Sequence, residues 1–314
     1  MGSLDVAHFS DPDEYATSIR ASRVQLTVTE RGHFAADRLR IDFKDLWMQR
    51  FHSNLAWVAH TSIDPARTVF FFRTKPGSPF FRGKTELGEN QLAFMSLAEA
   101  TFQRTTGTAS YAAMSLPAAV AATSLSEFAG LDLASPKSTQ HIQPEQAAFS
   151  RLLNLHAAAG NLAVIAPEII KNSNAALALE QELIHALVNC LVTSRYTADA
   201  SAERRHALIM RRFHAHIAAR SDHAIFIPEL CLAIGVSERT LRACCLEHLG
   251  MGPNRYLWLR RMQMARRALL HATPKVTSVT GVATDLGFWE LGRFAVSYRQ
   301  LYGESPSRTL ARIG

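Results

Sequence analysis

The residue type of this sequence that most clearly indicates a binding chemistry is arginine, and the arginines are concentrated in residues 203–314. The 314 residues carry 34 Lys and Arg against 27 Asp and Glu, a net charge of +7. Residues 203–314 hold 17 of these cations against 8 acids, a balance of +9, which leaves −2 for the residues before them. All of the 17 except Lys275 are Arg, whose planar guanidinium forms paired hydrogen bonds with a phosphate or a guanine edge. The pattern predicts a region that binds nucleic acid, with a merely solvated basic surface as the alternative.

Two of these arginines have the spacing of a shared helix face. Arg239 and Arg242 are three residues apart, so both can reach the same surface from one helix. Ser237 is a good N-cap for that helix, and Gly235 is expected to end a shorter helix that begins at Pro228. Two short helices joined in this way predict a helix-turn-helix unit, whose second helix enters the major groove.

The same arrangement recurs 52 residues later. Residues 285–288 align with residues 233–236, between an expected helix over 276–286 and another from 289 or 290 to about 301. A helix over 253–271 separates the two units and would be about 28 Å long. One turn of B-DNA is about 34 Å. The spacing therefore predicts two recognition helices in successive major-groove turns.

Together these pieces resemble the DNA-binding domain of the AraC/XylS family of bacterial transcription regulators. The match is gapped and covers about a third of the chain. The matching segments are Gly235-Val236-Ser237 with Leu241, Pro253-Asn254-Arg255-Tyr256, the helix Arg260–Leu270, Val282–Phe288, Arg293-Phe294 and Tyr298–Ser307. The family tends to carry an aromatic residue where this chain has Cys245, so that position departs from the pattern; Cys244 and Cys245 are expected to be small core residues.

The resemblance assigns base reading to the exposed face near the start of each recognition helix. In this sequence those positions are Arg239, Arg242 and Ala243 in the first unit and Gly292, Arg293 and Val296 in the second. Phosphate contacts, which position the protein without specifying a sequence, are expected from Ser237, Thr240, Ser297 and Arg299. Each base-reading arginine could instead contact phosphate or only water.

The residues before the basic region change from a strand pattern to a helix pattern. Residues 24–120 contain short runs that alternate with period two, enough for a barrel or a double sheet. Helices are expected over 145–159 and 167–193, and the second carries an apolar stripe. The stripe either packs against its own domain or forms a dimerisation seam; its leucines are Leu179, Leu183, Leu187 and Leu191.

The expected fold class is α+β, in two domains. Residues 1–200 are predicted to form an effector-binding and dimerisation domain, which by the resemblance is a cupin-like β-barrel followed by dimerisation helices. Residues 201–314 are predicted to form an all-α domain with two helix-turn-helix units. The short segment before the strands, residues 9–15, is similar to the N-terminal helix of the XylS-like branch.

By the resemblance, the barrel would bind a small effector. The candidates to line it are Trp47 with Gln49 and Trp57 with His60, on the expectation that each pair shares one face of its strand. Ordinary core or surface positions are the alternative for each. No His, Cys and carboxylate pattern typical of a metal site or an acid–base pair is present, so we expect no metal, no cofactor and no catalytic residue.

The leading hypothesis is a sequence-specific DNA-binding regulator, an activator, that responds to a small molecule. The alternatives are a cupin-type enzyme fused to a DNA-binding module and a non-specific architectural DNA binder. The expected partners are double-stranded promoter DNA, RNA polymerase, an effector and a second copy of the chain. Apolar runs shorter than a membrane span, a start unlike a signal peptide and cysteines without a CxxC pair predict a cytoplasmic, nucleoid-associated protein without a membrane partner.

Overall fold

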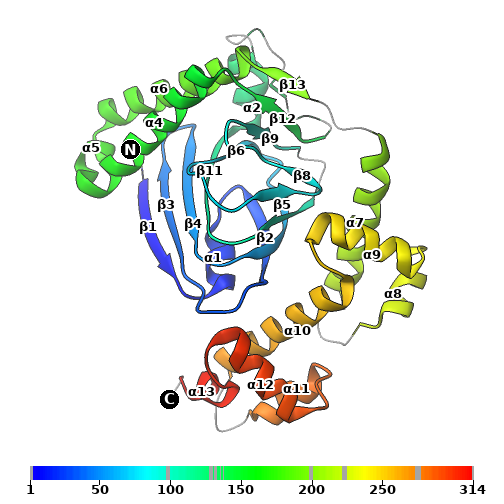
Figure 1. Cartoon of the computed structure of the whole chain (residues 1–314). Helices are drawn as coiled ribbons and strands as arrows, with labels where there is room; N and C mark the ends of the chain where they lie inside the picture. The colour runs from blue at the N-terminus through cyan, green and yellow to red at the C-terminus, as the bar shows by residue number, and fades with distance from the viewer. Residues whose placement is uncertain are drawn as a thin grey trace.

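The computed structural model describes residues 3–96, 100–126, 130, 133, 134, 136, 138–197, 201–220, 225–272 and 277–312. Strands lie in the first part of the chain, and helices make up the second (Figure 1). The strands are β1 (Ser3–Phe9), β2 (Ser22–Val28), β3 (Ala36–Asp42), β4 (Trp47–Ser53), β5 (Trp57–Ile63), β6 (Arg67–Arg73), β7 (Phe80–Arg82), β8 (Thr85–Glu86), β9 (Leu92–Phe94), β10 (Thr101–Thr105), β11 (Ala109–Pro117), β12 (Gln140–Gln143) and β13 (Arg195–Thr197).

The helices flank the sheets or follow them. They are α1 (Pro12–Ser18), α2 (Ala118–Val120), the π-helical turn η1 (Ala121–Leu125), α4 (Gln146–Ile165), α5 (Pro167–Lys171), α6 (Ser173–Val192), α7 (Ser201–Ala219), α8 (Ile227–Ile234), α9 (Glu238–Leu249), α10 (Pro253–Leu270), α11 (Val279–Asp285), α12 (Leu291–Tyr302) and α13 (Pro306–Ala311). The predicted domain boundary includes residues 198–200, which lie outside the described residues.

The strands form two antiparallel sheets rather than one closed sheet. One has the order β1-β3-β4-β11-β6-β9-β12-β13, and the other has the order β2-β5-β10-β7-β8. The long strand β11 is central to the first sheet, where Ala112 pairs with Arg50 of β4 and with Phe72 of β6. No strand pair among the described residues connects the two sheets, so the expected barrel is open along its sides.

Aromatic side chains fill the space between the two sheets. Tyr15 of α1 and Tyr111 of β11 place their hydroxyl oxygens 2.7 Å apart, and Tyr111 stacks on Phe51 with ring centroids 5.0 Å apart. Trp57 and Phe80 close the cluster from the smaller sheet. Burial raises the pKa of both tyrosines, so both remain protonated donors inside the core.

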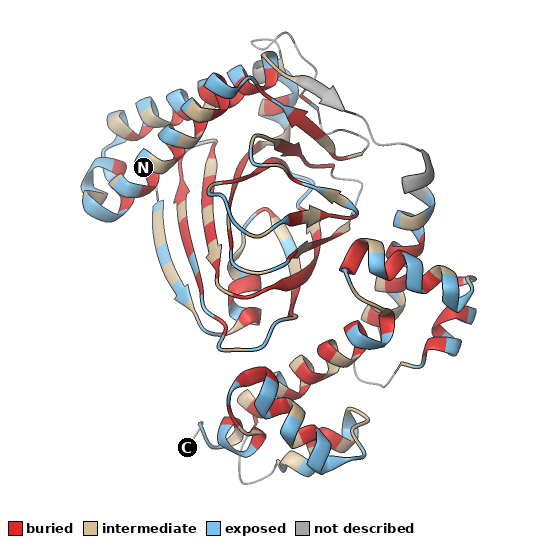
Figure 2. Ribbon diagram, in the orientation of Figure 1, coloured by how far each residue is buried: buried red, intermediate tan, exposed pale blue. Residues whose placement is uncertain are grey.

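Helices α4 and α6 cover the outer face of the larger sheet (Figures 1 and 2). Their buried side chains pack against the outward side chains of β3, β4, β6 and β11. The single helix expected over 167–193 is wrong in one respect, because the chain breaks at Asn172. The Asn172 side chain accepts hydrogen bonds from the backbone N–H groups of Asn174 and Ala175 and so caps a new helix, α6.

The leucine stripe of α6 packs inside its own domain. Leu183, Leu187 and Leu191 are at most 1% exposed and belong to the core under the larger sheet, while Leu179 packs at its edge. This is the first of the two interpretations that the sequence left open, and these leucines are not free to form a seam with a second copy.

From the sequence we expected no membrane span because its apolar runs are short, but helix α6 is long and apolar enough to pass that test. Within the described part of the chain it is the one helix long and apolar enough to cross a membrane, with a mean hydropathy of 1.4. Its polar Glu180 is nevertheless buried, where the carboxylate accepts hydrogen bonds from the backbone N–H groups of Asp45 and Leu46. The apolar composition of α6 thus serves a core helix of this domain.

Two further apolar clusters hold the helical region together, and α10 contributes to both. The first joins α7, α8, α9 and the start of α10, and it includes Val58 and Phe102 from the smaller sheet. The second joins the rest of α10 to α11, α12 and α13. The helical region is therefore built along α10 and shares part of its core with the strands.

Candidate nucleic-acid interface

The first helix pair consists of α8 and α9. Gly235 ends α8 with φ 71° and ψ 41°, a left-handed conformation that glycine adopts without steric cost. Ser237 then caps α9, because its Oγ accepts a hydrogen bond from the Thr240 N–H at 3.2 Å. Leu230 and Leu241 are fully buried between the two helices and fix their crossing. The capping expected from the sequence is confirmed at both positions.

The outer face of α9 presents unpaired arginines. Arg239, Arg242 and Ala243 are exposed. No hydrogen bond or ion pair joins either guanidinium to another residue in the described part of the chain. Thr240 is half-buried, and its hydroxyl lies 2.9 Å from that of Ser237 at the start of the same helix. The four predicted contact residues of α9 and the cap Ser237 therefore occupy one end of one helix.

The second helix pair consists of α11 and α12. Gly287, with φ 75°, lies in the turn, and Ser278 caps α11 through a hydrogen bond from the Gly281 N–H. Phe294, Tyr298 and Leu301 are buried along the inner face of α12. This second turn repeats the left-handed glycine of the first pair.

The outer face of α12 presents Gly292, Arg293, Val296 and Arg299, while Ser297 is half-buried. The predicted base-reading arginine of this helix is not free: its Nη1 lies 3.2 Å from a carboxylate oxygen of Glu290 in an exposed ion pair. Arg293 and Ser297 also border a hollow of about 230 Å³. The second pair therefore offers an arginine held by an acid, where the first offers two without such a partner.

Two residues on these faces were missed by the sequence analysis. Trp289 is 79% exposed at the start of α12, next to Glu290. Leu246 of α9 is 49% exposed and lies one turn beyond Arg242. The spacing of four residues from Arg242 to Leu246 is a signal that could have identified this residue, because it extends the outer face of the helix. Such apolar groups can contact the methyl group of thymine.

Helix α10 sets the distance between the two pairs. Its 18 residues give a length of about 27 Å. Its buried residues Tyr256, Leu259, Met262 and Leu269 are divided between the two apolar clusters, so each helix pair packs on its own part of α10. The length expected from the sequence is confirmed to within one residue.

The adjacent cysteines of α9 are core residues. Cys244 and Cys245 are fully buried, and burial raises the pKa of both thiols, that of Cys244 to about 11. A protonated buried thiol packs as a small apolar side chain. Within the described residues, no group of three or more His, Cys, Asp and Glu side chains is placed to hold a metal ion.

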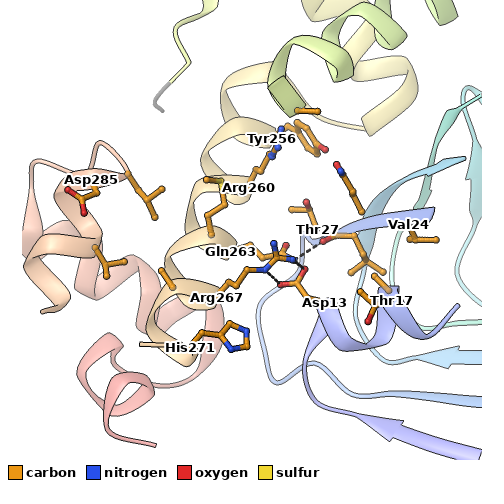
Figure 3. Close-up of a pocket in the computed structure, with 18 residues that line it drawn as sticks. Asp13, Thr17, Val24, Thr27, Tyr256, Arg260, Gln263, Arg267, His271 and Asp285 are labelled. Atoms are coloured by element: carbon orange, nitrogen blue, oxygen red, sulfur yellow. Dashed lines mark hydrogen bonds and ion pairs between the residues drawn. The ribbon is translucent and has the colours of Figure 1, made fainter. Parts of the chain in front are cut away.

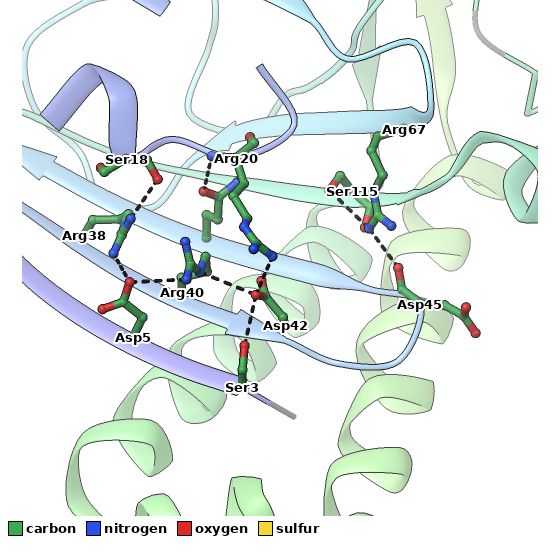
Figure 4. A network of polar contacts seen from close by, with 11 residues as sticks. Ser3, Asp5, Ser18, Arg20, Arg38, Arg40, Asp42, Asp45, Arg67 and Ser115 are labelled. Atoms are coloured by element: carbon green, nitrogen blue, oxygen red, sulfur yellow. Dashed lines mark hydrogen bonds and ion pairs between the residues drawn. The ribbon is translucent and has the colours of Figure 1, made fainter. Parts of the chain in front are cut away.

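The four effector candidates do not form one site. Two guanidinium groups lie over the Trp47 ring, with the Cζ atom of Arg67 3.8 Å and that of Arg20 4.8 Å from the ring centroid. Gln49 is buried, and its side chain exchanges two hydrogen bonds with the backbone of Arg20. Figure 4 shows the surrounding polar network, in which Arg67 donates to the carbonyl oxygens of Asp45 and Ser115.

The pairing of Trp57 with His60 is wrong. Their spacing of three residues places them on opposite faces of β5, since side chains alternate along a strand. Trp57 is buried between the sheets, where its Nε1 donates to the Ser53 hydroxyl at 3.0 Å. The His60 ring faces the helical region and stacks on His214 of α7, with centroids 3.2 Å apart.

The comparisons with known proteins include a family match that lies within the helical region of this chain. A family of helix-turn-helix domains matches residues 230–312. The "Probable thc operon regulatory protein" of Rhodococcus erythropolis is 34% identical over 150 residues, which are 45% of each chain. The "XylDLEGF operon transcriptional activator 2" of Pseudomonas putida is 38% identical over 88 residues, 28% of this chain and 56% of that protein. The chain thus spans about half the length of these relatives.

Solved structures of regulators also match. A probable AraC family transcriptional regulator from Rhodopseudomonas palustris is 35% identical over 33% of this chain and 95% of its own, with a TM-score of 0.30. The AraC-like transcriptional activator CuxR is 15% identical over 85% of this chain and 96% of its own, with a TM-score of 0.44. Through residues 230–312, the chain belongs to the AraC/XylS family of transcriptional regulators.

Proposed function

We propose that this protein is a sequence-specific DNA-binding transcription regulator, an activator, whose α8–α9 and α11–α12 pairs are two helix-turn-helix units. The observation that carries the proposal is the repeated geometry. Each pair turns through a left-handed glycine, each presents an exposed second helix, and α10 separates them by about 27 Å. That length is close to one turn of B-DNA, about 34 Å, so both second helices can enter the same face of a duplex.

The two recognition helices would contribute unequally. Arg239 and Arg242 of α9 have no acidic partner among the described residues, so both can donate to guanine O6 and N7. In α12, Arg293 must first leave Glu290, and Gly292 and Val296 offer no side-chain hydrogen bonds. We therefore assign stronger direct base reading to α9, and to α12 a larger share of readout through DNA shape.

The strand-rich region would act as the sensor. Its two facing sheets and covering helices are compatible with a cupin-like fold, which in this proposal responds to a small molecule. A homodimer would bind two half-sites, and an activator must engage RNA polymerase. The proposed compartment is the bacterial cytoplasm, at the nucleoid, where the DNA is.

Two other functions remain as alternatives. A cupin-type enzyme fused to a DNA-binding module would need an acid–base pair or ligand set, and the described residues offer no metal cluster. An architectural DNA binder would use the charge of residues 203–314 without needing two tuned helix faces. The relatives reported above are regulators, which favours the first proposal.

Footprinting on the DNA upstream of its own gene tests the proposal. The full-length protein should protect two stretches on one face of the duplex, one helical turn apart. A random duplex of equal length, at the same salt concentration, is the control. Equal affinity for both duplexes, lost in parallel as salt rises, would overturn the regulator and favour the architectural binder.

A further inference from the structure

The outer face of α12 offers few hydrogen-bonding groups in its first two turns. Val296, at a predicted base-reading position, is 57% exposed, and Trp289, just before the helix, is 79% exposed. Gly292, at another such position, has no side chain. The cation of this face, Arg293, pairs with Glu290. This part of the helix therefore presents mainly apolar surface to solvent, and exposed apolar surface gathered in one place marks a site of interaction.

The fold itself does not require a glycine at position 292. A Cβ built there would lie in open space, and the residue belongs to the regular helix α12. Glycine is a poorer helix former than alanine, so its presence favours the close approach of another molecule over helix stability. Because Gly292 lies one turn before Val296, its missing side chain leaves Val296 as the group that such a molecule would meet.

The strand-rich region contacts the second helix pair away from this face. At the junction of strands and helices, Arg267 of α10 donates to the Asp13 carboxylate at 2.8 Å, as Figure 3 shows. Nearby in the chain, the Gly32 N–H donates to the carbonyl oxygen of Leu301, a buried residue of α12, at 3.1 Å. These contacts hold α10 and α12 in place, and the exposure of Val296 shows that they leave the outer face open.

The chemistry of base edges restricts what an apolar side chain can read. In the major groove, guanine, adenine and cytosine present hydrogen-bond donors and acceptors, and the C5-methyl group of thymine is the apolar feature. A valine pressed against a polar edge would displace its water without replacing the hydrogen bonds, which is unfavourable. Thymine is therefore the base whose edge is complementary to Val296.

We propose that α12 selects thymine, by packing Val296 and Trp289 against C5-methyl groups in the part of the DNA site that it contacts. Helix α9, by contrast, presents Arg239 and Arg242, which are suited to guanine. The two halves of the site should therefore differ in base composition. This inference rests on the proposed function, and it adds a direct apolar contact to the shape readout assigned to α12.

Substitution of uracil tests the methyl group directly, because deoxyuridine pairs with adenine as thymidine does but lacks the C5-methyl group. Each thymine of the two footprinted stretches is replaced singly, and the affinity of the full-length protein is measured. In one stretch, uracil should weaken binding about three- to fivefold at the contacted positions, as the burial of one methyl group predicts. At such a position, 5-methylcytosine should bind more tightly than cytosine, because it restores the methyl group.

Two variants assign the contact to α12. Val296→Ala should make uracil and thymine equivalent at one sensitive position, and Trp289→Ala should do so at a neighbouring one. Both side chains are exposed, and alanine is a good helix former, so the fold should be unchanged. Val164→Ala is the matched control, because Val164 is 62% exposed near the end of α4; it should preserve every difference between uracil and thymine.

The outcomes separate this inference from the proposed function. Sequence-specific binding that no uracil weakens would overturn the inference alone. The same conclusion follows if the uracil effect persists at every position in both α12 variants, or disappears in Leu246→Ala, because the methyl contact would then belong to another element such as α9. Equal affinity for the upstream duplex and the random duplex, with or without uracil, would remove the proposed function and the inference with it.

Discussion

At the scale of single residues, the contrast between Arg239 and Arg299 can be measured. Arg239 lies at the start of α9, where it can reach a base edge, and Arg299 lies in the last turn of α12. Arg239→Ala should cost about 1–3 kcal/mol of discrimination at one base pair. Arg299→Ala should weaken all sequences alike and reduce the salt dependence. Binding measured on a set of single-base variants distinguishes the two, and a uniform loss for Arg239→Ala would reassign it to phosphate.

A substitution of Glu290 can test whether this acid holds Arg293, the predicted base-reading arginine of α12, away from DNA. The Glu290–Arg293 pair is exposed on both sides, so breaking it should leave stability nearly unchanged. Removing the negative charge should nevertheless strengthen DNA binding, because the carboxylate repels phosphate and competes for Arg293. Glu290→Gln is expected to raise affinity a few-fold at low salt, with a smaller gain at high salt. Weaker binding would instead identify Glu290 as a direct contact, for example with the amino group of cytosine.

At the scale of secondary-structure elements, α6 provides a matched pair of leucines. Leu187 is fully buried under the larger sheet, whereas Leu177 of the same helix is 47% exposed. Leu187→Ala should lower the free energy of unfolding by about 2–5 kcal/mol, since it leaves a cavity. Leu177→Ala should change it by at most about 0.5 kcal/mol. Urea denaturation measures both; a stable Leu187→Ala variant that becomes monomeric would restore the dimerisation seam.

The elements that the sequence could predict are those whose signals are local. The turn at Gly235, the cap at Ser237 and the length of α10 depend on neighbours within a few residues, and each was predicted correctly. The break at Asn172 also has a local signal, because asparagine is a good N-cap, but the longer apolar pattern on either side led us to expect one continuous helix. The strand β1 was missed because its partner β3 lies some 30 residues along the chain, and its own burial pattern is mixed.

The residues of the candidate sites also divide into those with local sequence signals and those that depend on contacts between distant segments. The exposure of Arg239, Arg242 and Arg293 follows from helix period, and the shared face of Arg239 and Arg242 on α9 could be predicted from their spacing. The contact of Arg267 with Asp13 could not, because it needs α1 and α10 together, and the two residues are 254 positions apart. The alternation of side chains along β5 already separates His60 from Trp57, but the contact of His60 with His214 could not be predicted, because His214 comes from another part of the chain.

At the scale of the whole molecule, the stacked His60–His214 pair makes the junction sensitive to acid. Burial lowers the pKa of His60 to about 3, with His214 adding to the effect, and burial with Arg260 lowers that of His214 to about 4. The unfolded chain, with a pKa near 6.5 for each ring, binds more protons than the folded protein below that pH. Their contribution to stability is therefore complete above pH 6.5 and is lost as the pH falls toward 4.

Urea midpoints at pH 7 and pH 5 measure this dependence. The loss should be of order 1 kcal/mol per histidine per pH unit within that window. A His60→Gln/His214→Gln double variant should show a shallower decline, because neutral amides bind no proton. The buried His156, whose pKa burial lowers to about 3, remains in both proteins and serves as the internal control. An equal decline in the two proteins would show that the pair does not sense pH.

The apolar cluster that includes Val58 and Phe102 has a practical consequence for dissecting the protein. Because these two residues of the smaller sheet cover part of Phe213 and Tyr256, a cut near residue 200 divides one core between two pieces. In a fragment of residues 201–314, the apolar surface around Phe213 and Tyr256 would be exposed to solvent. It should self-associate in sedimentation at concentrations where the full chain does not. The DNA affinity measured for such an associated fragment would therefore not equal that of the intact regulator.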